Sequence, residues 1–396
     1  MTETPELPLY MRRDGFALVP EMARIREDDG ILETVTPFGN AAYVITRHED
    51  IRRVFADAAT FSSDRPARLG TPAGEESKPR RDGFLIMYDP PDHTRLRRLL
   101  TPEFTVRRMK RLEPRITEIV SDALDDLERA GKPADLVSLF ALPVPSLVIC
   151  ELLGVPFGDR TGFQERSARM LDMSQPPEVR MKAGQDNREY MAGLVARAQA
   201  EPGEDMLGML VREHGGTLDA EEITGVADLL LLAGHETTSN MLGLGTLALL
   251  QDPDQLALLR DGDSAAVEAA VEELLRWLSI VHTLPPRLTT KEVELSGRVI
   301  PEGSLIIPSI PSANRDRAYI DDPERLDLAR GGMGHVAFGH GVHHCLGAPL
   351  ARMEMRTAFP ALLRRFPGLA LADPDAAPEF RVFSVVFGVK SLNVTW

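Results

Sequence analysis

The segment from Asp219 to Leu250 restricts the possible fold more than any other part of the chain. About 32 residues run there without proline, which corresponds to a helix of roughly 48 Å at 1.5 Å per residue. Asp219 is followed three residues later by Glu222, a spacing that resembles a helix-capping pair. Leucine and methionine occupy all sides of the predicted helix, as in residues 229–232 and 241–247. A helix that is apolar all round belongs in the middle of a large protein.

Other helices and short strands are predicted around this segment. Residues 40–57 read as a strand followed by a helix that starts near His48, and a hairpin is expected near Ser296-Gly297. Residues 64–83 read as a long loop, which in compact domains usually has a function. One further helix is expected to begin near Asp92, and others cover about 112–130, 138–153, 264–279 and 346–366. Residues 155–205 are helical in patches, and residues 383–396 at the end of the chain are strand-like. Because no linker is evident, we expect one large, mainly helical domain.

Composition limits the class of protein. The chain has 396 residues and a net charge of −15, which disfavours binding to a nucleic-acid backbone. Two cysteines exclude a disulfide scaffold and fit a reducing compartment. The sequence contains no run of about 18 apolar residues and no apolar signal core at its start. We therefore expect a soluble, cytoplasmic monomer that binds neither nucleic acid nor membranes.

The segment FGHGVHHCLG, residues 338–347, carries the strongest chemical signal. Its glycines indicate turns that side chains would block. Cys345 directly precedes a predicted helix, whose free N–H groups and partial positive charge favour a thiolate over a thiol. A thiolate there can bind a metal from one side. Gly339 and Gly341 would let a flat ligand lie close to the backbone, and Phe338 can pack beside the sulfur.

Polar residues interrupt the apolar central helix at AGHETTSN, residues 233–240. Buried polar groups need partners or a function. Ala233 and Thr237 are four residues apart and share a face. Gly234 removes a side chain at the same level, so we expect a small gap bordered by a hydroxyl. Thr237 can donate to a bound diatomic ligand, and Glu236 can relay protons from solvent.

The residues alone leave alternatives open for both segments. Cys345 can be a buried free cysteine in a turn, and the Thr237 hydroxyl can bond back to its own helix. A zinc site would use the cluster His335, His340, His343, His344 and Cys345. Three of these residues are adjacent and lack the usual spacers between ligands, which disfavours zinc. A zinc-protease motif is excluded because Ser239 stands where its second histidine is required.

Both segments resemble those of one family. FGHGVHHCLG matches the pattern Phe-x-x-Gly-x-x-x-Cys-x-Gly of the cytochrome P450 family, and AGHETTSN resembles that family's Ala/Gly-Gly-x-Asp/Glu-Thr stretch. The similarity covers essentially the whole chain and is closest to soluble bacterial members. It implies the cytochrome P450 fold, mainly α with small β regions, as a single domain over residues 1–396. It also implies haem b as cofactor and O₂ as co-substrate.

The resemblance implies a role for particular residues. Cys345 would be the axial thiolate ligand of the haem iron, while Glu236 and Thr237 would deliver protons. The expected cofactor-binding residues are His93, Arg97, Ala233, Gly234, Arg287, Phe338, His343, Cys345 and Gly347. Those expected at the two haem carboxylates are His93, Arg97, Arg287 and His343. Taken alone, His93, Arg97 and Arg287 could each be a plain surface residue.

The resemblance also implies a structural network and a substrate pocket. Glu273 and Arg276 alone would be an exposed i,i+3 pair. In the family this Glu-x-x-Arg is joined by an arginine of the following meander, here Arg325. Cys150, within an apolar helix, is expected in the core. The expected substrate-binding residues are apolar for the most part, which indicates a lipophilic, medium-sized substrate: Phe84, Leu85, Ile86, Leu229, Leu232, Ala233, Ile280, Val281, Thr283, Val385 and Val386.

Electrons must come from another protein, because no Gly-x-Gly-x-x-Gly lies between a predicted strand and helix. We expect a ferredoxin and its NAD(P)H-dependent reductase. On this chain, the ferredoxin would dock on a basic patch of Arg95, Arg98, Arg107, Arg108 and Lys110. The alternative is that these residues form only a solvated arginine face. The expected reaction is insertion of one atom of O₂ into a lipophilic small molecule, such as a natural product or xenobiotic. Alternatives are another oxidative outcome (aryl coupling, epoxidation, peroxide-driven oxidation) or a non-catalytic haem sensor.

Overall fold

The computed structural model describes residues 7–36, 39–64, 82–283 and 285–396. Most of the predicted loop 64–83 therefore lies outside the described residues. The chain forms two compact units. The β-rich unit comprises Met1–Arg98, Arg276–Leu326 and Gly334–Leu346, and the helical unit comprises Leu99–Leu275, Asp327–Met333 and Gly347–Trp396. The expectation of one domain remains a prediction.

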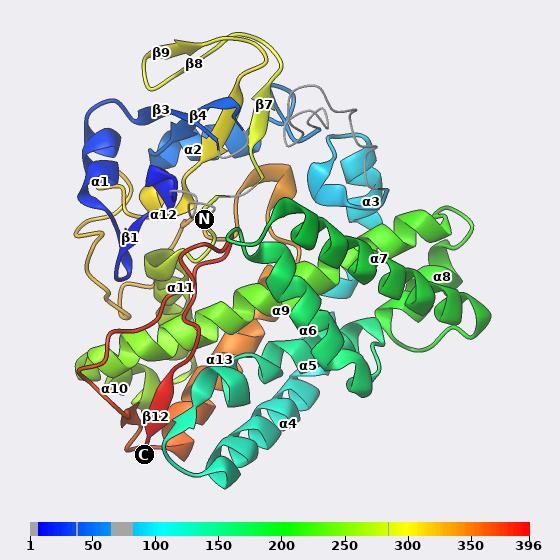
Figure 1. The fold of residues 1–396 in the computed structure, drawn as a ribbon, viewed down its shortest axis with the longest axis vertical. Helices are drawn as coiled ribbons and strands as arrows, with labels where there is room; N and C mark the ends of the chain where they lie inside the picture. Colours follow the sequence, from blue (N-terminus) through cyan, green and yellow to red (C-terminus); the bar gives the residue numbers. More distant parts are fainter. Residues whose placement is uncertain (1–6, 37–38, 65–81, 284) are drawn as a thin grey trace. The chain divides into compact units, whose positions relative to one another are not determined.

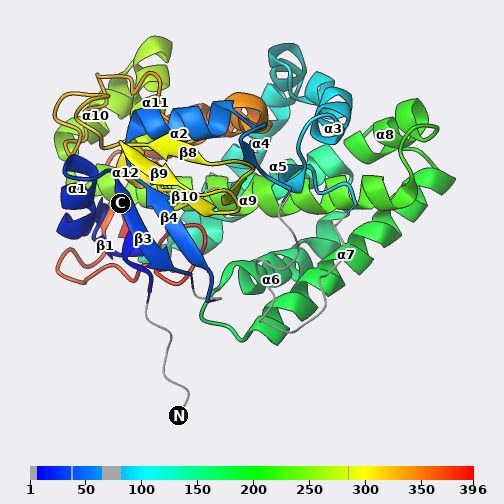
Figure 2. The same cartoon turned by 90° about the horizontal axis from the view of Figure 1, so that it is seen from above.

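A five-stranded sheet of order β3-β4-β10-β7-β5 organises the β-rich unit. Its strands are β3 (Ile31–Val35), β4 (Ala41–Ile45), β10 (Leu305–Pro308), β7 (Arg287–Thr289) and β5 (Phe61–Ser62). β4 and β10 are parallel, and the other pairs are antiparallel. Helix α2 (His48–Ala56) lies along this sheet (Figure 2) and places Ile51, Val54 and Phe55 in the core they share. The predicted strand followed by a helix at His48 is confirmed.

The predicted hairpin is also confirmed. β8 (Val293–Leu295) and β9 (Arg298–Ile300) pair antiparallel. The two turn residues, Ser296 and Gly297, have φ of 48° and 74°. Positive φ at both positions matches the right-handed twist of a two-residue hairpin. The unit's remaining elements are β1 (Arg13–Asp14), β2 (Ala17–Leu18), α1 (Pro20–Glu27), α12 (Ile310–Ala313) and 3₁₀ turns at Leu9–Met11, Leu85–Met87 and Gly341–His343.

Helix α9 (Ala220–Gln251) is the central element of the helical unit, with α5, α7 and α13 packed against it (Figure 1). Its N-terminus carries the predicted capping pair: Asp219 accepts from the Glu222 N–H at 2.8 Å, and the Glu222 carboxylate accepts from the Asp219 N–H at 3.4 Å. Most of its side chains are buried, as the all-round apolar pattern predicts. The central-helix prediction is confirmed.

The other helices surround α9 or flank it in sequence. They are α3 (Asp92–Leu100, shared between the units), α4 (Val106–Ala130), α5 (Pro143–Leu153), α6 (Arg160–Leu171), α7 (Pro177–Ala200), α8 (Met206–His214), α10 (Pro253–Asp261), α11 (Ser264–Leu278, shared) and α13 (Ala348–Arg365). Short turns lie at Thr101–Phe104, Val137–Ala141 and Phe157–Asp159. In the part of the chain that the structure describes, no helix combines the length and the apolarity needed to cross a membrane.

Three expectations differ from the structure. α4 begins at Val106 rather than near 112, because Thr105 caps it by accepting from the Arg108 N–H. Residues 155–205 form two long helices rather than patches, since Pro177 stands in the first turn of α7 and does not interrupt it. The end of the chain forms a strand only at β12 (Asn393–Thr395), which pairs with β6 (Ala134–Asp135) and β11 (Ala370–Leu371).

Candidate functional site

The cysteine segment crosses the end of α2 at very short range. Gly341 has φ of 69°, and a Cβ there would lie 2.2 Å from the carbonyl oxygen of Phe55. Gly341 is therefore needed for approach to the protein's own backbone. Its expected approach to a flat ligand stays a prediction. Cys345 donates its N–H to the Phe338 carbonyl at 2.9 Å, which closes the turn. The Cys345 side chain is exposed, and α13 begins three residues later.

Four basic residues expected at the haem carboxylates lie together in the β-rich unit. The rings of His93 and His343 have centroids 4.1 Å apart. Arg97 interacts electrostatically with both histidines and with Cys345. Arg287 is 2% exposed, and its guanidinium lies 5.7 Å from the Phe55 ring centroid. The structure thus brings residues of α3, β7 and the cysteine segment to one place.

This cluster is electropositive and suited to an anion. Burial, reinforced by Arg97, lowers the pKa of His93 to about 4. Burial, reinforced by Arg287, lowers the pKa of His343 to about 3. Neither ring nitrogen of the buried His93 has a hydrogen-bond partner among the described residues. His343 Nε2 lies 3.0 Å from the hydroxyl oxygen of Ser63, a contact that the sequence did not predict. An anionic ligand would supply His93 with the partner it lacks.

One face of α9 is incompletely covered. Leu229, Leu232 and Thr237 are half-buried and Ala233 is exposed, whereas most of this helix is buried. Their spacing places them on one stripe of the helix. Thr237 donates to the Ala233 carbonyl at 2.9 Å, which is the local bond considered as an alternative from the sequence. The stripe offers an apolar surface with one hydroxyl to a ligand.

Gly234 does not open the gap that we expected. A Cβ at this position would lie 2.7 Å from Cδ1 of Ile149 in α5. The space left by the missing side chain is therefore filled by a neighbouring helix, and close packing explains the glycine. Its expected place beside the oxygen is untested.

Glu236 points to another side of α9 and is 3% exposed. Arg381, which the sequence analysis did not single out, donates to its carboxylate at 3.0 Å. Asn240 donates to the same carboxylate at 3.4 Å and to the Glu236 carbonyl at 2.7 Å. A cavity of about 370 Å³ lies beside these groups and is also lined by Glu165 and Lys390.

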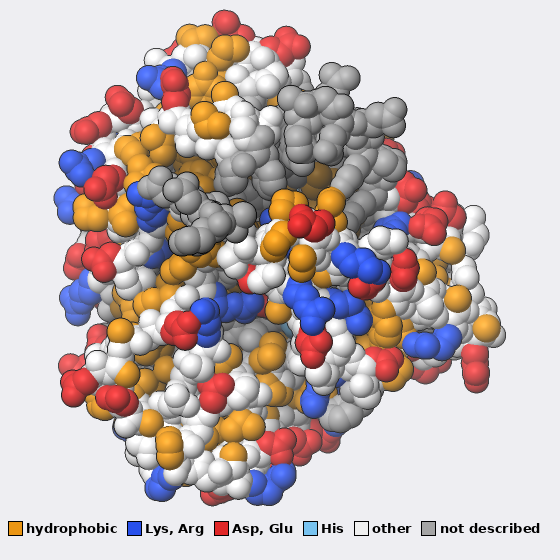
Figure 3. Space-filling model, viewed as in Figure 1, with side chains coloured by type: hydrophobic (Ala, Val, Ile, Leu, Met, Phe, Trp, Pro, Cys, Tyr) orange, Lys and Arg blue, Asp and Glu red, His pale blue; other side chains and the backbone are white. Residues whose placement is uncertain are grey.

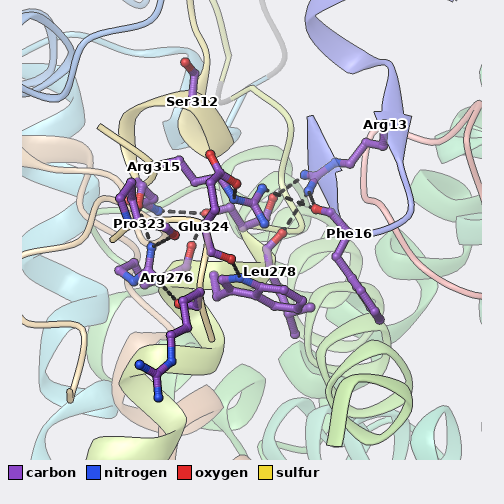
Figure 4. Close-up of polar contacts among 12 residues, drawn as sticks. Arg13, Phe16, Arg276, Leu278, Ser312, Arg315, Pro323 and Glu324 are labelled. Carbon is purple, nitrogen blue, oxygen red and sulfur yellow. Dashed lines mark hydrogen bonds and ion pairs between the residues drawn. The ribbon is translucent and has the colours of Figure 1, made fainter. Parts of the chain in front are cut away.

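The Glu-x-x-Arg helix takes part in two sets of polar contacts. In the β-rich unit, the fully buried Arg276 donates to the carbonyls of Asn314, Pro323 and Arg325. Figure 4 shows this cluster, with the guanidinium of Arg315 3.0 Å from Glu324. Burial lowers the pKa of Arg315 to about 10. Asn314 accepts from the N–H of Val336 at 2.8 Å, so the cluster also holds the approach to the cysteine segment.

The arginine near Glu273 is not the one that we predicted. In the helical unit, Glu273 accepts from the N–H of Asp327 at 3.1 Å and lies 3.9 Å from the guanidinium of Arg330. Arg325 contributes its backbone carbonyl to Arg276 instead. Both arginines belong to the same short segment, and spacing alone did not distinguish them.

The expected substrate residues fall in both units. Phe84, Leu85, Ile86, Ile280, Val281 and Thr283 belong to the β-rich unit, and Leu229, Leu232, Ala233, Val385 and Val386 belong to the helical unit. Leu85, Ile280 and Val386 are buried, and most of the others are half-buried. Their role in substrate binding stays a prediction.

Other expectations can be placed briefly. Burial raises the pKa of Cys150 to about 12, consistent with a core thiol. Within residues 7–36, 39–64, 82–283 and 285–396, no three His, Cys, Asp or Glu side chains are arranged to hold a metal ion, which gives the zinc alternative no support. Arg95, Arg98, Arg107 and Lys110 are exposed, whereas Arg108 pairs with Glu103 at 2.8 Å. Acidic and basic side chains are interspersed on the face drawn in Figure 3.

Comparisons with known proteins define the class. A sequence model of the cytochrome P450 family matches residues 19–182 and 265–391. Cytochrome P450 FAS1 of Rhodococcoides fascians is 49% identical over the full length of both chains. Vitamin D3 dihydroxylase of Streptomyces griseolus is 40% identical over all of this chain and 98% of its own. The structure of P450 StaH from glycopeptide antibiotic A47934 biosynthesis matches with a TM-score of 0.88 and 44% identity, covering 99% of this chain and 100% of its own.

The chain belongs to the cytochrome P450 family. It has the fold of that family and is a monooxygenase, an oxidoreductase that uses haem b and O₂. The residues present fit this cofactor. The cluster of His93, Arg97, Arg287 and His343, of which His93 and Arg287 are buried, suits the two carboxylates of haem. The imidazole of His93, which has no hydrogen-bond partner among the described residues, can donate to one of them.

Proposed function

We propose that this cytochrome P450 hydroxylates a lipophilic small molecule, with electrons from a ferredoxin and its NAD(P)H-dependent reductase. One observation carries the assignment of the site. The exposed Cys345 and the electropositive cluster of His93, Arg97, Arg287 and His343, all of them buried or half-buried, lie in one compact unit. We also expect a monomer that works in the cytoplasm.

Each group of residues has a task in this proposal. Cys345 is the thiolate ligand of the iron, and the four basic residues neutralise the haem carboxylates. Bound haem with a thiolate ligand activates dioxygen and favours cleavage of its O–O bond. Phe338, Gly347, Ala233 and Gly234 would lie against the cofactor. The stripe of Leu229, Leu232 and Ala233 would contact an apolar substrate, and its incomplete burial in α9 supports this.

Proton delivery is assigned to Glu236 and Thr237. Glu236 borders a cavity of about 370 Å³, from which it can take up a proton, and its carboxylate is held by Arg381 and Asn240. The Thr237 hydroxyl donates to Ala233, so its oxygen still has lone pairs with which to accept a proton. An oxygenase needs these two residues, whereas a haem sensor does not.

The test is product analysis under ¹⁸O₂, after a spectral-shift screen has identified a binding compound. Hydroxylation predicts a product that gains one labelled oxygen atom. A product that loses two hydrogen atoms and gains no label would instead support the alternative of aryl coupling. If both Glu236→Gln and Thr237→Ala leave the yield of product per electron unchanged, the assignment of proton delivery is wrong.

A further inference from the structure

The last part of the chain before β12 forms a hairpin, residues 379–390, in the helical unit (red trace in Figure 1). Arg381 donates its N–H to the Gly388 carbonyl at 2.7 Å, and Lys390 donates its N–H to the Glu379 carbonyl at 2.9 Å. The rings of Phe380 and Phe387 stack, with centroids 5.2 Å apart. We call this segment the C-terminal hairpin. Because these contacts hold the two sides of the hairpin together, the position of the Arg381 side chain depends on where the hairpin lies.

The tip of the C-terminal hairpin pairs with the connection between α6 and α7, residues 172–176. Met173 donates its N–H to the Phe383 carbonyl at 2.6 Å, and Val385 donates its N–H to the Leu171 carbonyl at 3.3 Å. Asp172 and Ser384 form an antiparallel bridge between these bonds. A displacement of the connection must therefore break these bonds or move the hairpin.

The base of the C-terminal hairpin rests on α9. A Cβ at Gly388 would lie 1.6 Å from the amide oxygen of Asn240, so backbone and helix are in direct contact. Beside this contact, Arg381 donates to the Glu236 carboxylate at 3.0 Å, and Asn240 donates to the same oxygen. The buried carboxylate is thus held by one donor from its own helix and one from the hairpin.

Other charged groups near Glu236 do not replace Arg381. Nε2 of His235 lies 3.9 Å from the Glu236 carboxylate, but burial lowers the pKa of His235 and so disfavours its charged form. Lys390 lines the same cavity and is paired with Glu379. Among the described residues, Arg381 is the only lysine or arginine that forms an ion pair with Glu236.

We propose that Arg381 is a positioning residue for Glu236, and that the C-terminal hairpin couples this carboxylate to the connection between α6 and α7. When the connection moves, the hairpin tip moves with it and withdraws Arg381 from Glu236. Proton uptake by Glu236 then depends on the position of this connection. The inference rests on the proposed function of Glu236 in proton delivery.

The structural half of the proposal is tested by hydrogen exchange of the haem-loaded enzyme. Arg381→Leu should accelerate exchange of the Met173 amide by about threefold or more, because the hairpin loses its anchor on α9. Arg381→Lys should restore slow exchange, since it keeps the ion pair. The control, Arg129→Leu, removes an exposed arginine paired with Asp126 and should change nothing. Unchanged exchange in Arg381→Leu would overturn the coupling.

A double-mutant cycle measures the pair itself. In urea unfolding, Arg381→Leu and Glu236→Gln should be non-additive by about tenfold in the equilibrium constant, as for residues in contact. Additivity would overturn the positioning role. If Arg381→Leu does not fold, Arg381→Lys and Arg381→Gln replace it in both experiments.

The functional half is tested by turnover with NADH, ferredoxin and reductase, without added substrate. Peroxide consumes two electrons per O₂ and water consumes four, so peroxide released per NADH reports proton delivery. Arg381→Leu should raise this ratio about as much as Glu236→Gln, and Arg381→Lys should lower it again. If the peroxide released per NADH rises in Glu236→Gln but not in Arg381→Leu, the positioning role is overturned. A ratio unchanged in both variants would reject proton delivery by Glu236, while hydrogen exchange still decides the coupling.

Discussion

Gly341 illustrates, at the scale of single residues, how much of the cysteine segment the sequence predicts. Three glycines indicated turns, and φ of 72° at Gly339 and 69° at Gly341 confirms that two of these positions favour glycine. The reason for Gly341, contact with the Phe55 carbonyl, was not predictable because Phe55 is distant in sequence. The same limit explains Arg330 and Arg381, whose partners are also set by tertiary packing.

Gly341→Ala should destabilise the enzyme more than the same change in an open turn. Both Gly341 and Gly297 have positive φ, but a Cβ at Gly297 meets no atom within 4 Å among the described residues. Gly297→Ala should therefore cost about 1 kcal/mol from backbone strain alone. Gly341→Ala should cost at least about 2 kcal/mol more, because its Cβ collides with backbone. Urea unfolding measures both, and equal losses would contradict the contact.

The two neutral histidines predict how stability of the haem-free chain depends on pH. Their pKa values, about 4 for His93 and about 3 for His343, lie below the ordinary 6.5. Below pH 6.5 the unfolded chain binds protons that the folded chain does not, so stability falls as pH decreases toward these values. His93→Asn should reduce this dependence between pH 6.5 and 4.5. An unchanged slope in denaturant titrations would show that His93 is not buried in this way.

At the scale of elements, prediction succeeded where a local pattern decides the structure. The capping pair and apolar surface of α9 gave its bounds to within a residue. Prediction from the local pattern failed for α6, α7 and the C-terminal hairpin. Residues 383–389 are mostly apolar and strand-like in composition, yet the hairpin packs on α9 and, among the described residues, has only isolated bridges. Such packing depends on residues far away in sequence, which a local pattern does not contain.

The contact between α9 and α5 gives a prediction at this scale. Alanine normally stabilises a helix relative to glycine by about 1 kcal/mol, and Gly193→Ala in α7 should do so because its Cβ meets no neighbour within the described structure. Gly234→Ala should be about 1–3 kcal/mol less favourable than Gly193→Ala because it crowds Ile149. Ile149→Val removes the nearest atom, Cδ1, and Ile149→Ala also removes Cγ1, so the difference in urea unfolding should decrease in the first variant and decrease further in the second. A difference that is the same in both backgrounds would place the strain elsewhere.

For the whole molecule, charge matters through encounter with the electron donor. The net charge of −15 would repel the acidic ferredoxin of the proposed function, so its docking would require local basic side chains. Arg98 and Lys110 are exposed and have the charge required. Arg108, expected in the same patch, is paired with Glu103 and contributes less. The sequence identified the basic residues but not which of them is neutralised by a partner.

Arg98→Gln and Lys110→Gln should each slow reduction by ferredoxin, by roughly severalfold at low ionic strength. Because salt screens this attraction, the rates of variant and wild-type enzymes should converge as salt increases. Arg108→Gln should have a smaller effect, and Arg129→Gln, which alters a separate exposed ion pair, should have none. Stopped-flow reduction measures these rates. Equal slowing by all four variants would contradict a specific docking surface.

The central claim is that the thiolate of Cys345 binds the haem iron. The most direct measurement is the absorption spectrum of the reduced carbon monoxide complex, because its band position depends on the axial ligand. Wild-type enzyme and Cys150→Ser should both show the band of a thiolate-bound haem, since Cys150 is a core residue. Cys345→Ser should lose it. A thiolate band that persists in Cys345→Ser, or disappears in Cys150→Ser alone, would contradict the account.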